Sequence, residues 1–205
     1  MDWTTLPLKK YNEIKDVYLD PEYTDEDRLL AQVQIVFEID PYKLPVSELK
    51  NYISQLSFFE KKVPTMKVKE KYNLGGNIYR LKKNLKDFTV AQWLDWQNYL
   101  KNGSGPENFA NLLSVFFFPN NNNDEYGEYD VEQVKSDISN YLSIADALSI
   151  SSFFLNYRKA LSILFLLYTK KITLKSPLTR KQRKELRKEI RKALKTTLIG
   201  DSHHS

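Results

Sequence analysis

The spacing of apolar residues along this chain is that of a mainly helical protein. Apolar positions three and four residues apart recur over five stretches, which we predict as helices. These stretches are residues 9–18, 25–37, 47–63, 89–101 and 106–118. Two further helices are expected to follow Asp130 and Ser143, and the last of them extends to about Thr169.

Capping signals support several of these helix starts. Thr24 and Thr89 each precede an apolar periodic stretch, where a threonine side chain can accept a hydrogen bond from a free backbone N–H. Asp130 is followed three residues later by Gln133, which is the spacing of a capping box. Ser143 and Asp146 are spaced in the same way, so the sequence predicts a second box there.

One region departs from the helical pattern. Residues 65–71 and 77–81 alternate loosely between apolar and polar, and Gly75 and Gly76 lie between them. Two adjacent glycines supply the positive φ angles that a tight hairpin turn needs. We therefore predict one small β-hairpin near 65–82 in a multi-helix body, a mainly α fold that is α+β at the margin.

Charge divides the chain into two predicted parts. Residues 1–169 hold 19 Lys and Arg against 23 Asp and Glu, for a net charge of −4. Residues 170–205 hold 12 Lys and Arg against 3 Asp and Glu, for a net charge of +9. We expect a helical body over 1–169 and a basic C-terminal arm over 170–205, separated near Ser176 and Pro177.

The arm itself predicts an amphipathic basic helix. Leu186, Ile190 and Leu194 form a narrow apolar stripe between cations. The cations are Arg180, Lys181, Arg183, Lys184, Arg187, Lys188, Arg191, Lys192 and Lys195. Such a segment can bind a protein partner, nucleic acid or a membrane surface, or it can be a solvated tail. No aromatic residue lies among the cations, so stacking on bases is not predicted.

Composition excludes many kinds of catalytic and metal-binding site. The chain has no Cys, and its two His residues, His203 and His204, lie at the very C-terminus. Thiolate metal sites and histidine-dependent catalysis inside the fold are thus excluded. We predict no catalytic residues, no cofactor and no metal. The acidic cluster at 124–132 lacks the spacing of a calcium loop, and Gly75–Gly76 lacks that of a phosphate loop. A pair of glycosidase carboxylates cannot be recognised by spacing, so that alternative stays open.

No membrane span or secretory signal is predicted either. The most apolar stretch, residues 160–168, is much shorter than the roughly 20 residues that a spanning helix needs. We therefore expect a soluble, intracellular protein. Its 13% aromatic residues are more than enough to build a core.

Clustered aromatic residues are the remaining candidates for a functional surface. Side chains of this kind can line a ligand pocket but more often belong to the core, and an exposed part would mark a protein interface. The candidate interface residues are Trp93, Trp96, Phe116, Phe117 and Phe118. An apolar run such as 116–118 in a helix suggests burial against a partner, and therefore an oligomer or a subunit of an assembly.

Three blocks of sequence resemble a loosely defined family of small proteins encoded among the structural genes of tailed bacteriophages. The blocks are residues 79–95, residues 109–119 (FANLLSVFFFP), and residues 128–130 with 142–154. The likeness covers about residues 8–168 and rests on hydrophobic patterns. Members are called tail-assembly-chaperone-like.

The resemblance implies a non-enzymatic protein that binds other phage structural or assembly proteins. It would be a chaperone for a tail or head component in the host cytoplasm, or a minor component of the virion. The alternative, from the residues themselves, is a nucleic-acid-binding accessory protein that uses the basic arm. A homo-oligomer is compatible with either.

Overall fold

The computed structural model describes residues 1–84, 88–120 and 126–155. The chain divides into two compact units, Met1–Ser151 and Ser152–Ser205. The first unit contains the elements discussed below, except that the last described helix runs past its end at Ser151. The predicted border between body and arm, at residues 169 and 170, lies outside the described residues.

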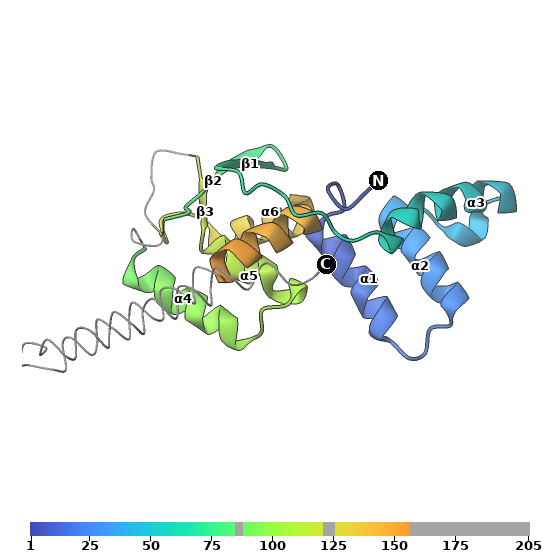
Figure 1. Cartoon of the computed structure of the whole chain (residues 1–205), viewed down its shortest axis with the longest axis horizontal. Coiled ribbons are helices and arrows are strands. Elements are labelled where there is room, and N and C mark those ends of the chain that lie inside the picture. The colour runs from blue at the N-terminus through green and yellow to red at the C-terminus, as the bar shows by residue number, and fades with distance from the viewer. Residues whose placement is uncertain (85–87, 121–125, 156–205) are drawn as a thin grey trace, which may run out of the picture. The chain divides into compact units, whose positions relative to one another are not determined.

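The first unit is mainly helical with one small sheet, as the sequence predicts (Figure 1). Its α-helices are α1 (Leu8–Leu19), α2 (Asp25–Phe37), α3 (Val46–Gln55), α4 (Val90–Lys101), α5 (Phe109–Ser114) and α6 (Val131–Tyr141). Short 3₁₀ helices are η1 (Pro41–Lys43), η2 (Leu56–Glu60) and η4 (Pro106–Asn108). A further helix begins at Ile144 and is described as far as Leu155.

Capping explains where most of these helices begin. Thr24 and Thr89 both form complete capping boxes, with Asp27 and Gln92 as their respective partners. The box predicted at Asp130 is incomplete. The Asp130 side chain accepts from two backbone N–H groups, but the Gln133 amide turns away and donates to Asp137.

The hairpin is confirmed, but it is shorter than predicted and belongs to a three-stranded sheet. β1 (Lys71–Leu74) pairs antiparallel with β2 (Asn77–Leu81), which pairs antiparallel with β3 (Phe117–Pro119). Gly75 and Gly76 form the turn with φ of 60° and 90°. Residues 65–69 are not part of a strand.

The helix predicted over 106–118 is wrong at its C-terminal end. The chain forms η4 and α5 and then becomes β3. The reason is the apolar run Val115–Phe118, whose side chains are all buried. A fully buried run has no polar positions whose spacing would distinguish a helix from a strand. In the structure the end of the run forms the third strand, which pairs with β2 in the register Arg80↔Phe118.

Helix α6 organises the unit because it contacts α1, α5, β1 and β3 (Figure 1). The inner face of the sheet turns towards it and is buried, including Tyr72, Leu74, Tyr79 and Phe117. The N-terminal segment closes the other side. Leu8 N donates to Leu142 O at 2.9 Å, and Ile144 N donates to Leu6 O at 2.9 Å.

Candidate functional site

Helix α3 presents apolar side chains that the rest of the unit leaves partly open. None of its residues is buried, and Val46 is 69% exposed. Val46, Leu49 and Ile53 follow the i, i+3, i+7 spacing of one helix face, and Leu49 and Ile53 are only half-buried. We call these three residues the α3 stripe.

The scaffold holds α3 at one side and at its C-terminal end. The Tyr52 ring packs against Phe37 of α2, with centroids 4.9 Å apart. After the helix, Phe58 of η2 is buried and lies edge-on to Trp3, with centroids 5.2 Å apart. Trp3 Nε1 also donates to Lys61 O at 2.8 Å. The α3 stripe is therefore carried by a fixed helix, which lowers the entropy cost of binding a partner.

The outer face of the sheet carries a row of cations. Strand alternation sends Lys71 and Arg80 to the side opposite the buried face, and the register sets them directly across from each other. Lys82 directly follows β2 and lies beside them in the lining of one pocket. We call these three residues the cationic face.

A surface pocket of about 440 Å³ lies over the cationic face. Its lining also includes Lys83, Phe118 and one acid, Glu70. Lys82 Nζ lies 5.2 Å from the centre of the Phe118 ring, a cation–π distance. Across the residues that the structure describes, neither Lys71 nor Lys82 forms an ion pair.

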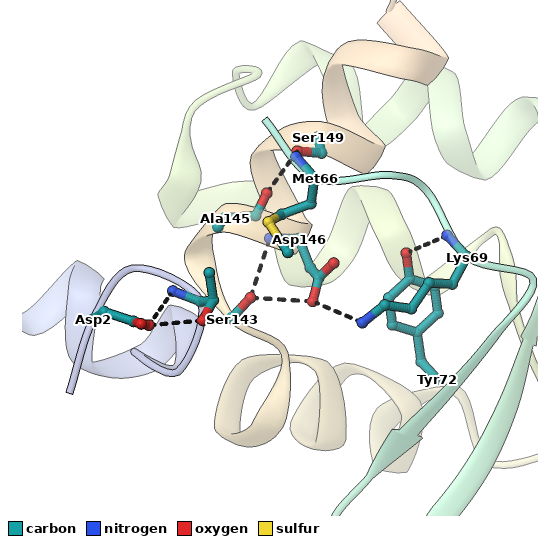
Figure 2. Close-up of polar contacts among 9 residues, drawn as sticks. Asp2, Met66, Lys69, Tyr72, Ser143, Ala145, Asp146 and Ser149 are labelled. Carbon is teal, nitrogen blue, oxygen red and sulfur yellow. Dashed lines mark hydrogen bonds and ion pairs between the residues drawn. The ribbon is translucent and has the colours of Figure 1, made fainter. Parts of the chain in front are cut away.

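A polar cluster joins the start of the sheet to the helix that begins at Ile144 (Figure 2). Asp146 N donates to Ser143 Oγ at 3.1 Å, so Ser143 caps the helix as predicted. The Asp146 carboxylate accepts from Ser143 Oγ at 3.2 Å and not from the Ser143 backbone N–H, so the predicted capping box is only half formed. Lys69 Nζ lies 3.8 Å from the same Asp146 oxygen. Met66 N donates to Ser149 Oγ at 2.8 Å. The cluster fixes the extended segment that leads into β1.

The same cluster borders a second pocket of about 320 Å³. Asp146 is 8% exposed, and its Oδ1 accepts no hydrogen bond from the described residues. Tyr72 OH accepts from Lys69 N at 3.0 Å, and burial raises the pKa of Tyr72 to about 12. The phenol therefore stays protonated at neutral pH. The Asp146 carboxylate, the Lys69 ammonium and the neutral Tyr72 phenol hold the backbone of this segment in place. None of these three groups is an activated nucleophile.

A second buried carboxylate, Asp137, is fully used by the fold. It accepts from Tyr79 OH at 2.6 Å, Asn77 Nδ2 at 2.8 Å and Gln133 Nε2 at 2.8 Å. Burial raises the pKa of Asp137, but these three hydrogen bonds favour the charged form and hold it below its usual range. The carboxylate ties α6 to β2.

The acids near residue 130 do not converge on one point. Asp130 caps α6, and Glu132 forms an ion pair with Lys135 at 2.6 Å. Among the described residues there is no group of three acidic or histidine side chains that could hold a metal ion. Asp124 and Glu125 lie outside those residues.

The structure separates the aromatic residues that were candidates for an interface. Trp96, Phe116, Phe117 and Phe118 are all at most 4% exposed. Trp96 packs edge-on against Phe116, and Phe117 packs against Tyr72. These four belong to the core because residues 115 and 116 pack against α4 and β3 pairs with β2, and they present no free surface. Trp93 alone is half-buried.

The nine arm cations, Arg180 to Lys195, lie outside the described residues, and binding of a partner or nucleic acid by the arm stays a prediction. Sequence reasoning missed the cationic face. The signal was present, because residues 61–84 hold eight Lys and Arg and a single acid. Sequence reasoning placed these charges within a net-acidic body, which concealed their concentration.

The helices in the described part of the chain are all too short or too polar to cross a membrane. No family model, curated protein or solved structure matches this chain. The function is therefore argued from the two surfaces described above, the α3 stripe and the cationic face.

Proposed function

We propose that this chain is a non-enzymatic binding protein that docks on another protein through the α3 stripe. The observation that carries the proposal is that α3 is amphipathic and yet buries none of its side chains. The resemblance to phage tail-assembly-chaperone-like proteins supports a partner among phage structural or assembly proteins, met in the host cytoplasm or in the virion.

The geometry fits recognition of a helix by a groove. In that mode an amphipathic helix inserts apolar side chains at i, i+3 and i+7 into an apolar groove of the partner. Val46, Leu49 and Ile53 have this spacing, and Tyr42 of η1, which is 76% exposed, lies just before them in the chain.

The apolar surface gives a useful binding energy. Full burial of a Leu or Ile side chain is worth roughly 1.5–3 kcal/mol. Completing the burial of two half-buried side chains therefore adds about 1–1.5 kcal/mol each, and Val46 contributes a similar amount because it is more exposed. These residues would form the centre of an interface, with polar contacts at its rim.

The proposal is tested by site-specific photo-crosslinking in an extract of infected host cells. Full-length chain carries a photoreactive phenylalanine analogue either at Val46 or at Lys101, which is an exposed position on α4. We expect a discrete adduct from position 46 and none from position 101. Unlabelled wild-type chain should abolish the adduct by competition.

Competition with variants ties the adduct to the stripe. Leu49→Ala should compete about tenfold less well than wild type, whereas Ser47→Ala, on an exposed polar position of the same helix, should compete normally. Equal adducts from both positions, or equal competition by both variants, would refute docking through α3. An adduct whose mass is twice that of the chain would identify the partner as a second copy.

A further inference from the structure

The cationic face differs in charge from the helices that precede it. Residues 1–60, which contain α1 to α3, hold 6 Lys and Arg against 12 Asp and Glu. Residues 61–84, which contain β1 and β2, hold eight cations against one acid. A polyanion is thus repelled by one part of the unit and attracted to another, which orients its approach.

We propose that the cationic face is a binding site for the phosphodiester backbone of nucleic acid. Lys71, Arg80 and Lys82 form a row across the outer face of the sheet, beside a pocket of about 440 Å³. Lys71 is exposed, and Arg80 and Lys82 are half-buried. Arg80 already takes part in an interaction within the protein, so the site relies on the ammonium groups of Lys71 and Lys82. This inference does not depend on the α3 stripe.

The form of the site favours a backbone over a single small phosphate. The cations line one pocket, but Lys71 also lines the pocket of about 320 Å³ that Lys69 borders, so the positive charge extends beyond a single point. Arg80 and Lys82 are two residues apart, which is roughly 6–7 Å along a strand. Contacts of this kind position a nucleic-acid backbone without reading its sequence.

The nearby aromatic ring does not read bases. Phe118 lies on the same face, but it is 4% exposed and is covered by Lys82 at 5.2 Å. Base stacking needs an accessible ring face. We therefore expect binding without sequence preference, held by charge and strongly dependent on salt.

The polar cluster of Figure 2 sets the position of this face. Lys69 and Asp146 anchor the segment that leads directly into Lys71, and the Lys69–Tyr72 hydrogen bond fixes the first turn of chain at β1. The face is therefore carried by fixed elements. Binding then avoids the entropy cost of ordering a loop.

The test measures fluorescence anisotropy of a labelled single-stranded dT20 with full-length protein over a range of salt concentrations. The double variant Lys71→Gln/Lys82→Gln removes two charges from the face. Lys9→Gln/Lys101→Gln is the matched control, because it removes two charges from exposed helical positions. Circular dichroism checks that both variants fold.

The expected loss follows from counterion release. Each phosphate contact on a single strand contributes about 0.7 to the slope of log K against log salt. Losing two contacts should flatten the slope by about 1.4 and weaken binding about 25-fold at 0.1 M salt. The control should change affinity less than threefold. Equal losses in both variants, or none in either, would overturn the site.

A second pair of proteins distinguishes binding by the cationic face from binding by the basic arm. Arg180, Lys181, Arg183 and Lys184 are changed to Gln in the full-length chain, with and without Lys71→Gln/Lys82→Gln. A persisting difference between the two supports a site on the sheet. If the difference disappears, the face only extends the arm and the proposal is wrong.

Competitors distinguish other anions. Inorganic phosphate and poly-glutamate are added at constant ionic strength and at the same charge concentration as unlabelled dT20. We expect dT20 to displace the labelled strand far better than either. Equal displacement by phosphate would overturn the assignment in favour of a small phosphate ligand, and equal displacement by poly-glutamate in favour of an acidic protein.

Discussion

Replacing Asp137 with alanine should destabilise the first unit more than its single position suggests. The carboxylate accepts hydrogen bonds from Tyr79, Asn77 and Gln133. Tyr79 is 3% exposed, so its hydroxyl would lose its partner inside the core. An unsatisfied buried polar group costs about 1–3 kcal/mol.

The other two donors add less, because their residues are exposed and water can replace the carboxylate. We assign them about 0.5 kcal/mol each, the lower end for a hydrogen bond. The total expected for Asp137→Ala is about 3 kcal/mol. Asp137→Asn keeps an acceptor for Tyr79 and should cost about half as much.

Urea unfolding of the full-length chain, followed by tryptophan fluorescence, gives these free energies. Tyr79→Phe should cost about 1.5 kcal/mol, and the double variant Tyr79→Phe/Asp137→Ala should cost little more than Asp137→Ala alone, because both remove the same bond. A loss below about 1 kcal/mol for Asp137→Ala, or simple additivity in the double variant, would refute this account.

Three further predictions concern the same unit. The pKa of Asp137 is lowered in the folded state, so the stabilisation by its carboxylate is present above about pH 4 and is lost as pH falls towards the folded pKa. The difference in unfolding free energy between wild type and Asp137→Asn should therefore shrink over that range. A constant difference would contradict this prediction. Gly75→Ala should cost about 1–2 kcal/mol, because φ is +60° and the new Cβ would clash with the Tyr141 ring, which must move. Denaturant unfolding measures this cost, and an unchanged midpoint would contradict it. Gln92→Ala should cost about 2 kcal/mol, since Gln92 is buried and donates to Val115 O at 3.0 Å; in the same assay, a cost below 0.5 kcal/mol would show that the carbonyl finds another donor.

Local signals in the sequence were sufficient for most helices and for the turn. Thr24 and Thr89 act within four residues of chain, so their capping boxes can be predicted without knowledge of the fold. Gly75 and Gly76 likewise require only their own backbone angles. The box at Asp130 failed because Gln133 has a better partner in Asp137, which already lies at the junction with the sheet.

The surfaces could not be predicted in this way, because each depends on what packs against it. The pattern of α3 indicates an apolar side but not whether another element covers that side. The cationic face exists only through the register that places Lys71 opposite Arg80, and through a third strand at 117–119 that is indistinguishable from a helix in sequence.

The central claim is that the α3 stripe binds a partner and contributes little to folding, and one variant separates these roles. Affinity for the partner crosslinked at position 46 and unfolding free energy are both measured for Leu49→Ala, with Ser47→Ala as control. The account predicts an affinity loss of about tenfold, equivalent to about 1.4 kcal/mol, with a stability loss below about 1 kcal/mol. Unchanged affinity together with a stability loss of 2 kcal/mol or more, in the usual range for a core leucine, would show that Leu49 serves the fold and would contradict the account.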